Sequence, residues 1–298
     1  MAEEQQQTDV HDLSSVLELA LDRTEATATK AANGNGFGSG LPTGFKDVDA
    51  LTGGLTDGAL MVIAARPAMG RSTLLMGICR HVSLMHVVPT LHVSLEHTIA
   101  ETSLRLTSSE CRIALHRLRS GTMDATDWDR LAKRLPKISE APLHFWAPAR
   151  LTAGQLAVRA HSEVEERGIK LIAVDGIQDI RPEKRNELRE REVGDVVRDL
   201  KTLARELDIP IVATSHLNRA PEARRDRVPM LDDLRESGAI TYAADTIILL
   251  HRPDAYVKES PRAGEADLIF AKHRDGPTAV VTVAFQGHYS RFVDMART

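Results

Sequence analysis

What is scarce in this sequence excludes several classes of protein. The 298 residues include only two cysteines, Cys79 and Cys111, too few for a disulfide framework or a cysteine-rich zinc site. No apolar run approaches the length of about 20 residues that a membrane-spanning helix needs, and the acidic, glutamine-rich segment 1–10 is unlike a signal peptide. We therefore expect a cytoplasmic protein without membrane contact, in which both cysteines are small core residues.

An excess of charge of either sign is also lacking. The chain carries 38 Lys and Arg residues against 42 Asp and Glu residues, which gives a formal net charge of −4. This balance argues against a generally basic nucleic-acid-binding protein, although a local basic channel is compatible with it. With 42% hydrophobic residues, a chain of this length can bury a large core in one or two domains.

The first 40 residues are expected to form a disordered tail, an amphipathic helix and a flexible linker. The polar segment 1–11 predicts disorder, and the glycine-rich segment 33–40 predicts the linker. The helix 12–32 is too isolated to form its own core, so its apolar stripe should pack on the main domain or on a neighbouring subunit; a loosely attached tail is the alternative. The stripe consists of Leu13, Val16, Leu17, Ala20 and Leu21.

Residues 41–298 are expected to form one α/β domain with a mostly parallel twisted sheet flanked by helices. Apolar runs of strand length alternate with longer helical patterns there. The last two runs flank the turn 272–277 and predict an antiparallel hairpin at the edge of the sheet. The expected strands are 59–65, 90–94, 143–146, 171–174, 209–214, 245–250, 265–271 and 278–285, and the expected helices are 71–86, 99–109, 127–135, 153–166 and 188–207.

One short stretch combines the features of a phosphate-binding loop. The apolar run 59–65 leads into a tight turn containing Gly70, and a helix-compatible segment begins near Arg71. In such a strand–turn–helix arrangement, backbone N–H groups point inward and bind phosphate oxygens. The usual pattern G-x-x-x-x-G-K-[ST] is broken twice, because Ala65 replaces the first glycine and Arg71 replaces the lysine. Taken alone, the stretch fits an altered phosphate loop or a coincidence.

Three expected strands end in polar residues. Asp175 follows one apolar strand and suits Mg²⁺ coordination. Glu96 follows a strand that we expect next to the phosphate loop, where a carboxylate can deprotonate the water that attacks a γ-phosphate. The segment 215–219 ends a third strand and suits sensing of that phosphate. Turn and helix-cap roles are the plainer alternatives, but open α/β sheets bind ligands at the carboxyl ends of their strands.

Eight short motifs follow one another along the chain. They are Thr43-Gly44-Phe45, Ala65-Arg66-Pro67-Ala68-Met69-Gly70, Ser94-Leu95-Glu96, Val174-Asp175, Ser215-His216-Leu217-Asn218-Arg219, Asp233-Leu234-Arg235-Glu236-Ser237-Gly238, Ala244-Asp245 and Lys272-His273-Arg274-Asp275-Gly276-Pro277. In this order and approximate spacing they resemble the RecA-type motor domain of the DnaB-type replicative DNA helicases. The resemblance spans about residues 41–292. One phosphate loop alone would be a weak match, whereas eight ordered motifs are specific.

The resemblance implies ATP and Mg²⁺ as cofactors and assigns roles residue by residue. Arg71 stands in place of the phosphate-binding lysine, and Ser72 and Asp175 would hold Mg²⁺. Glu96 would be the general base, and His216 stands where the family carries a glutamine that senses the γ-phosphate. The loop residues that would surround the phosphates are Ala65, Arg66, Pro67, Ala68, Met69, Gly70, Arg71, Ser72 and Thr73.

The resemblance also implies a homo-oligomer, a hexameric ring acting on single-stranded DNA. Lys272 and Arg274 match basic residues that reach the ATP of the neighbouring subunit, so hydrolysis would require the ring. The predicted helix 12–32 is similar to the family's linker helix, which docks on the adjacent subunit. A helicase loader and other replication proteins are further implied partners. The residues that match the DNA-holding loop of the central channel are Arg235, Glu236 and Gly238.

Plainer interpretations exist for the charged motifs. Arg235 and Glu236 could form a surface ion pair, and the charges of Lys272 and Arg274 could prevent other chains from pairing with an exposed edge strand. The order of the motifs favours the functional interpretation over both. The run 181–191 fits a second DNA-facing loop or an exposed charged loop that leads into a helix, and the basic cluster 219–227 has the same two interpretations.

Three features depart from the family pattern. Only a short tail precedes the predicted helix 12–32, so we expect the family's N-terminal collar domain, which meets primase, to be absent. Arg71 keeps the charge of the lysine, but its planar fork is longer and wider than an ammonium group. His216 replaces the glutamine at the step that couples loss of the γ-phosphate to motion. Since two of these changes affect the ATP cycle, we expect slow hydrolysis.

Two functions fit this sequence. The first is an ATP-dependent DNA helicase or translocase, favoured by Glu96, Asp175 and Arg274, because an inactive ATPase has no chemical need for all three. The second is a DnaB-like regulator that binds nucleotide and DNA, or a helicase partner, with little unwinding. Arg71, His216 and the missing collar domain favour this alternative. A recombination-type or clock-type RecA relative fits less well, because the motifs from 233 to 238 and from 272 to 277 argue against it.

Overall fold

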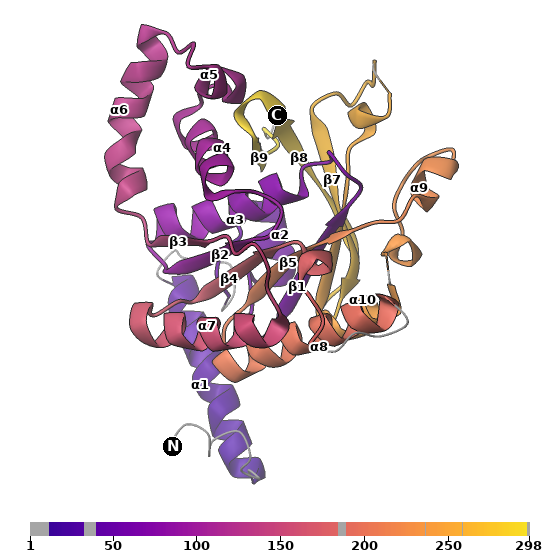
Figure 1. Cartoon of the computed structure of the whole chain (residues 1–298). Coiled ribbons are helices and arrows are strands. Elements are labelled where there is room, and N and C mark those ends of the chain that lie inside the picture. Colours follow the sequence, from indigo (N-terminus) through magenta and orange to yellow (C-terminus); the bar gives the residue numbers. More distant parts are fainter. Residues whose placement is uncertain (1–11, 33–39, 184–188, 236, 258, 297–298) are drawn as a thin grey trace.

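A nine-stranded sheet forms the centre of the molecule (Figure 1). The structure, a computed structural model, describes residues 12–32, 40–183, 189–235, 237–257 and 259–296. The strand order is β3-β2-β4-β5-β1-β6-β7-β8-β9. The strands are β1 (Leu60–Ala65), β2 (Thr90–Ser94), β3 (Leu143–Trp146), β4 (Leu171–Asp175), β5 (Ile211–His216), β6 (Thr246–His251), β7 (Glu265–His273), β8 (Ala279–Gln286) and β9 (Arg291–Asp294).

The first six strands are parallel and the last three are antiparallel. The chain is therefore α/β with an antiparallel extension, as the sequence predicted. The helices are α1 (Leu13–Ala32), α2 (Lys46–Thr52), α3 (Arg71–His86), α4 (Ile99–Cys111), α5 (Leu115–Ser120), α6 (Ala125–Ser139), α7 (Ala153–Arg167), α8 (Arg189–Leu207), α9 (Ala220–Ala223) and α10 (Ser237–Ala243).

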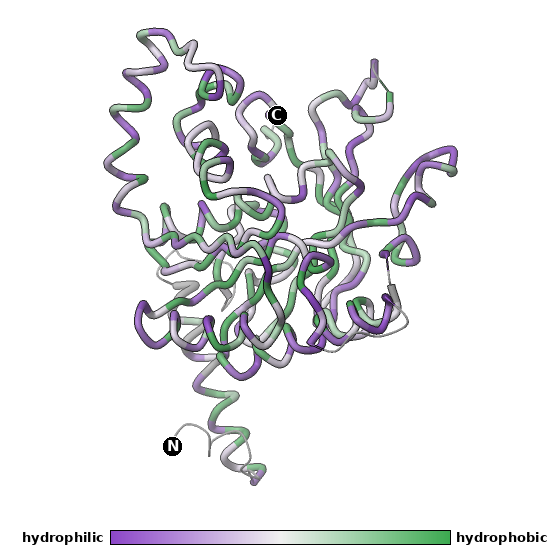
Figure 2. Tube along the Cα trace, viewed as in Figure 1, coloured by the Kyte–Doolittle hydropathy of each residue, from purple (hydrophilic) through white to green (hydrophobic). Residues whose placement is uncertain are grey.

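Apolar side chains cover both faces of the parallel part of the sheet. One core cluster joins the strands to α7, α8 and α10, and the other joins them to α2 and α3. The strand residues of β1, β4 and β6 are buried throughout, which is typical of strands covered on both faces. Figure 2 shows the same distribution as hydrophobic strands inside a more polar outer layer. Cys79 and Cys111 are both buried, as expected.

Helix α1 lies apart from these two layers (Figure 1). Its large apolar side chains Leu13, Val16, Leu17 and Leu21 are all exposed. The predicted helix is confirmed within one residue at each end, but its apolar stripe has no partner in the described part of this chain. The polar segment 1–11 and residues 33–39 of the glycine-rich segment lie outside the described residues. Within the described part, every helix is too short or too polar to cross a lipid bilayer.

Two expectations about the sheet were wrong. We expected β2 next to the phosphate-loop strand β1, but β4 and β5 lie between them. We also placed the hairpin of β7 and β8 at the edge, whereas the short strand β9 pairs with β8 and forms that edge. The first error arose because strand order follows from how the whole sheet packs, and neighbours along the chain need not be neighbours in the sheet. The second arose because the four-residue strand β9 was not predicted. Helices α2, α5, α9 and α10 were not predicted either, and all are seven residues or shorter.

The start of α4 fixes the segment that carries Glu96. Thr98 caps this helix: its side chain accepts a hydrogen bond from the N–H of Glu101, and the Glu101 carboxylate accepts one from the N–H of Thr98 at 3.0 Å. This reciprocal capping box satisfies two backbone donors that the helix itself leaves unpaired.

We expect Thr98→Ala to lower the free energy of unfolding by about 1 kcal/mol, since it removes the cap acceptor. For a chain of this size the melting temperature should fall by about 2 °C. Ser103→Ala, on the same helix but away from the cap, is the matched control and should stay within about 0.5 kcal/mol of the parent. Equal melting temperatures for both variants would contradict the role of the cap.

Candidate active site

The phosphate loop has the backbone geometry of an anion-binding turn. It connects β1 to α3, and Ala68 and Gly70 have φ angles of 67° and 102° in the left-handed region. No side chain caps the start of α3 at Gly70, so the first backbone N–H groups of this helix remain available to an anion. A Cβ at Gly70 would lie 3.0 Å from Cζ of Phe292. Both its φ angle and this close approach therefore require glycine at position 70.

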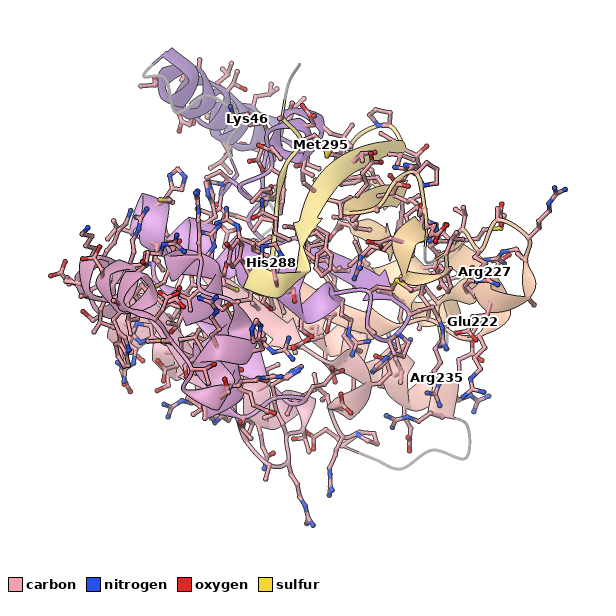
Figure 3. The ribbon with its side chains drawn as sticks, turned by 90° about the horizontal axis from the view of Figure 1, so that it is seen from above. Lys46, Glu222, Arg227, Arg235, His288 and Met295 are labelled. Carbon is pink, nitrogen blue, oxygen red and sulfur yellow. The ribbon has the colours of Figure 1, made fainter. Side chains whose placement is uncertain are left out.

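Two arginines hold the loop in this shape. Arg66 donates a hydrogen bond to the carbonyl of Leu217 at 2.9 Å and pairs with the carboxylate of Glu222 at 2.6 Å. Arg252, which follows β6, donates to the carbonyl of Ala68 at 3.4 Å. Arg66, which we expected among the nucleotide-binding residues, is thus bound to the segment after β5. Figure 3 shows Glu222 on that segment, on the same side of the molecule as Arg235.

Arg71 points towards the ends of β2 and β5. Its guanidinium forms an ion pair with Glu96. Nη1 and Nη2 lie 2.5 Å and 2.9 Å from the two ring nitrogens of His216, and Nη1 also donates to the carbonyl of Ser215 at 3.4 Å. Only 7% of the Arg71 side chain is exposed. The residue that replaces the lysine is therefore bound to the expected general base and to the expected phosphate sensor.

The environment of Glu96 favours its charged form. Burial acts against the charge, but the hydrogen bond with His216 and the charge of Arg71 outweigh it and hold the pKa of Glu96 below its usual value. Nε2 of His216 lies 3.2 Å from Oε1 of Glu96. Glu96 is thus ionised at neutral pH, as a general base must be. While it is paired with Arg71, however, it has to leave this partner before it can take a proton from water.

Asp175, at the end of β4, is buried and accepts several hydrogen bonds. Ser72 Oγ and Thr214 Oγ1 donate to Oδ1 at 3.0 Å and 2.8 Å. Nδ1 of His97 lies 3.6 Å from Oδ2. Burial opposes the charge, but the interactions with His97, His92, Thr214 and Ser72 outweigh it, so the pKa of Asp175 lies below its usual value. The predicted pair of Mg²⁺ ligands, Ser72 and Asp175, is therefore already in contact and offers the oxygen ligands that Mg²⁺ prefers.

Several residues that line the cleft beside the loop were not predicted. Arg105 of α4 donates to Nε2 of His97 at 3.3 Å, and its side chain lies in the same cleft as Arg71 and Glu96. Glu96 takes part in two groups of carboxylate and histidine side chains here. The first contains His97 and Asp175, and the second contains Asp179 and His216. Apart from the contact between His97 and Arg105, which are eight positions apart, these groups depend on residues far apart in the sequence, so local spacing does not predict them. The unpredicted lining residues are His97, Arg105, Leu115, Phe285, Gly287 and Ser290.

Lys272 and Arg274 lie at the opposite end of the strands from the cleft. Strand β7 runs antiparallel to β6, so β7 finishes near the amino ends of the parallel strands, and Lys272 pairs with Ile247 there. Arg274 donates to Oδ1 of Asp245 at 3.1 Å. Of the five expected catalytic residues, the fold thus gathers Glu96, Asp175 and His216 in the cleft and keeps the two basic residues away from it.

The expected DNA-facing loop lies next to the end of β5. The N–H of Arg235 donates to the carbonyl of His216 at 3.2 Å, and Leu234 pairs with Leu217 in an antiparallel bridge. Arg235 is exposed (Figure 3), and Gly238 lies in the first turn of α10. Glu236, the third expected DNA contact, lies outside the described residues. Residues 184–188 of the charged run 181–191 lie outside them too, and α8 begins directly after that gap.

Comparison with known proteins connects this geometry to one family. The family model described as "DnaB-like helicase C terminal domain" matches residues 40–294. The chain is 44% identical over 292 residues to the replicative DNA helicase DnaB of Leifsonia xyli subsp. xyli, which covers 98% of this chain and 63% of the relative. It is 49% identical over 226 residues to the DnaB of Mycobacterium leprae, covering 76% of this chain and 37% of that protein. The chain thus spans less than two thirds of the length of these relatives.

Solved structures similar to this chain come from helicases of the same kind. The ATPase domain of G40P superposes with a TM-score of 0.88 at 30% identity and covers 97% of this chain and all of that domain. A DnaB-like replicative helicase, solved in a study of its interactions with primase, superposes with a TM-score of 0.85 at 30% identity. That match covers 97% of this chain and 68% of the helicase.

Proposed function

The chain belongs to the family of DnaB-like helicase C-terminal domains, and on that basis we propose that it is the ATP-hydrolysing motor of a ring-shaped helicase or translocase that moves along single-stranded DNA. One observation carries the proposal. The phosphate loop brings Ser72 into contact with Asp175 and brings Arg71 into contact with Glu96. A phosphate-binding turn, a site for a divalent cation and an ionised base thus meet in one cleft, as phosphoryl transfer requires.

ATP enters this cleft with its phosphates on the loop. The N–H groups at the start of α3 bind phosphate oxygens, and Gly70 lets the backbone approach them. Ser72 and Asp175 would hold Mg²⁺, which would neutralise charge on the phosphates. Thr214 keeps Asp175 oriented through its 2.8 Å hydrogen bond. The oxygen atoms of Ser72 and Asp175 fit a magnesium ion, and the open turn of the phosphate loop fits the phosphates of ATP.

Hydrolysis depends on Arg71 leaving Glu96. The γ-phosphate is the stronger attraction for the guanidinium, because it carries more negative charge than one carboxylate. Once released, Glu96 accepts a proton from the attacking water. His216 contacts both residues and is therefore positioned to respond to the presence of the γ-phosphate. The required exchange of ion pairs accounts for the slow turnover that we propose.

Lys272 and Arg274 act on the neighbouring subunit. They lie near the amino ends of the parallel strands, so a head-to-tail ring that sets this end of the sheet against the next subunit's cleft would bring them to its nucleotide. An arginine supplied in this way stabilises charge on the transferred phosphoryl group. The exposed stripe of α1 would be buried against an adjacent subunit of the same ring. Arg235 and the loop around it would face the DNA backbone.

A DnaB-like regulator without useful unwinding is the second candidate. The observation that favours it is the ion pair between Arg71 and Glu96, with both groups also bound to His216. If bound ATP fails to break this cluster, the chain binds nucleotide and DNA but does not hydrolyse ATP. Both functions predict nucleotide binding, so only a measurement of ATP hydrolysis distinguishes them.

The test measures ATP hydrolysis by the purified full chain at increasing concentrations of single-stranded DNA. We expect an oligomer whose hydrolysis rate rises when DNA binds, because in the proposed function DNA would contact Arg235 and nucleotide would contact His216, and these two residues are joined by a hydrogen bond. An oligomer that binds ATP and DNA but shows no hydrolysis would favour the regulator. Failure to bind nucleotide at all would overturn both functions.

A further inference from the structure

We propose that Asp179 and His216 form an acid–base pair that takes up the proton of the attacking water after Glu96 has removed it. His216 accepts this proton from Glu96. Asp179 is a positioning residue, because it acts through His216 and stabilises the imidazolium that results. The proposal rests on the proposed function and adds a second proton acceptor to the cleft.

A single 3₁₀ turn, η1 (Ile177–Asp179), carries Asp179. It follows β4, which pairs with β5, the strand that ends at His216. Gln178 joins this turn to the end of β5. Its side-chain nitrogen donates to Oγ of Ser215 at 2.9 Å, and its side-chain oxygen accepts from the N–H of His216 at 3.2 Å. The residue next to Asp179 thus holds η1 against the strand that carries His216.

Gly176, directly before this turn, leaves room for the carboxylate of Asp179. Its φ angle of 108° lies in the left-handed region, and a Cβ at this position would lie 2.5 Å from Oδ2 of Asp179. The N–H of Gly176 donates to Oγ1 of Thr214 at 2.8 Å, so its backbone is also held by β5. Both the conformation and the close approach of the carboxylate therefore favour glycine at position 176.

This arrangement places two carboxylates close to one imidazole. One carboxylate oxygen of Glu96, one of Asp179 and one ring nitrogen of His216 all lie within 4.8 Å of one another. Nε2 of His216 is 3.2 Å from Oε1 of Glu96, which is a hydrogen-bonding distance. An opposite charge within about 4–6 Å favours the charged form of an ionisable group. Both carboxylates therefore favour the protonated form of His216.

Arg71 opposes that protonation while it remains in the cluster. It contacts both ring nitrogens of His216, at 2.5 Å and 2.9 Å, and its positive charge disfavours a second cation there. The other charged groups that face the ring are Glu96, after β2, and Asp179, in η1. In the proposed function Arg71 moves to the γ-phosphate, so negative charges alone remain beside the ring. His216 thus becomes a better proton acceptor when Glu96 becomes free.

The charge of Asp179 is strained by its neighbours. Burial and the charge of Glu96 raise the pKa of Asp179 above its usual value, although the charges of His216 and Arg71 act in the opposite direction. Once Arg71 has moved away, the two carboxylates repel each other without a cation near them. A proton on His216 supplies that cation and relieves the repulsion.

The proton transfer takes place in two steps. The water oxygen forms a bond to the γ-phosphorus while the bond from this phosphorus to the bridging oxygen of ADP breaks, and Glu96 takes one proton of the water. Glu96 then passes this proton to Nε2 of His216, whose neutral ring carries its hydrogen on Nδ1. After phosphate has left, Arg71 returns to the cluster and its charge drives the proton into solvent. Each turnover thus releases one proton and restores every group.

The experiment measures single-turnover ATP hydrolysis by the full chain with single-stranded DNA, from about pH 5.5 to about pH 9. Only the neutral ring of His216 can accept a proton, so the rate should fall as the pH drops through the pKa of His216. Because Asp179 raises that pKa, Asp179→Asn should move the fall about one pH unit lower. It should also lower the rate at high pH about fivefold, because the imidazolium loses a stabilising charge.

Two further variants serve as controls. Asp129→Asn makes the same chemical change on the exposed face of α6, where Asp129 pairs with Lys133, and should keep the pH profile of the parent. Asp179→Glu keeps the charge and should recover most of the rate and the position of the fall. A profile of Asp179→Asn that matches the parent would overturn the proposal, and so would an equal loss in Asp179→Glu.

The His216→Gln background tests whether Asp179 acts through His216. In this background Asp179→Asn should change neither the rate nor its dependence on pH, since the imidazole is gone. The same effect of Asp179→Asn in both backgrounds would show that Asp179 acts elsewhere and would contradict the pair. A parent chain without any hydrolysis contradicts the motor function and the pair with it. A hydrolysing parent whose pH profile is insensitive to Asp179→Asn contradicts the pair alone.

Discussion

Glu96→Gln is expected to abolish DNA-stimulated ATP hydrolysis, with a loss of about 10²–10⁴-fold in kcat, the range typical of a removed general base. An amide has nearly the shape of the carboxylate but cannot accept the proton of the attacking water. Binding of ATP should persist and become somewhat tighter, because Arg71 loses the carboxylate that competes with the phosphates for it. The measurements are steady-state hydrolysis and the Kd for a fluorescent ATP analogue.

The matched control for this prediction is Glu165→Gln, at an exposed position on α7. It makes the same chemical change away from the cleft and should leave both measurements unchanged. Hydrolysis by Glu96→Gln at the rate of the parent would remove Glu96 from the mechanism. Loss of ATP binding together with hydrolysis would show that the residue supports the cleft rather than the chemistry.

The second large effect is expected for Arg71→Lys, which should raise kcat about tenfold, equivalent to about 1.4 kcal/mol of barrier. The planar guanidinium of Arg71 contacts Glu96 and both ring nitrogens of His216 at once. An ammonium group is compact and lacks this fork, so it cannot keep the same three contacts. Lysine would therefore release Glu96 more readily and would still place a positive charge on the phosphates.

His216→Gln is the natural companion to this substitution. Because Arg71 and His216 are in direct contact, the two changes should not be additive. We expect the increase in kcat of the double variant Arg71→Lys with His216→Gln to exceed the product of the changes in the two single variants. Each single variant leaves one residue adapted to a partner that has been replaced. Measured kcat values for the four proteins test this as a double-mutant cycle. A loss of activity in Arg71→Lys would show that the loop works through its arginine and that the ion pair does not limit turnover. Strict additivity would show that positions 71 and 216 affect turnover independently.

Several parts of the site followed from local sequence. Buried apolar runs that end in a carboxylate placed Asp175 and Glu96 at strand ends, and glycine in a tight turn located the phosphate loop. These features depend on residues within one or two turns of the chain, where hydrogen-bond pattern and side-chain periodicity decide the outcome. The order of the eight motifs then indicated the helicase family that the chain resembles. Helix α4 illustrates the boundary of such reasoning: its start at Ile99 was predicted, but its end extends to Cys111 instead of 109.

The partners of Arg71 illustrate what sequence reasoning missed. Glu96 is 25 positions away along the chain and His216 is 145 positions away, and no local rule relates such residues. Their meeting depends on β4 and β5 being inserted between β2 and β1, which in turn depends on packing of the complete sheet. Lys272 donates hydrogen bonds to the carbonyl groups of Thr241 and Ala244 at the end of α10. This contact has the same origin, because it requires β7 to run back along β6.

The sequence by itself determined the class of fold, the phosphate loop and the two strand-end carboxylates, because each is encoded by short-range spacing of side chains. It also indicated the family, through the order of eight short motifs along residues 41–292. Only the tertiary structure decided that Arg71 is bound to Glu96 and His216, that Lys272 is held by carbonyl groups at the end of α10, and that Arg274 is held by Asp245. These are contacts between distant segments. They form where the burial of two apolar sheet faces brings strands and helices together, and that arrangement minimises the free energy of the whole chain rather than of any one stretch.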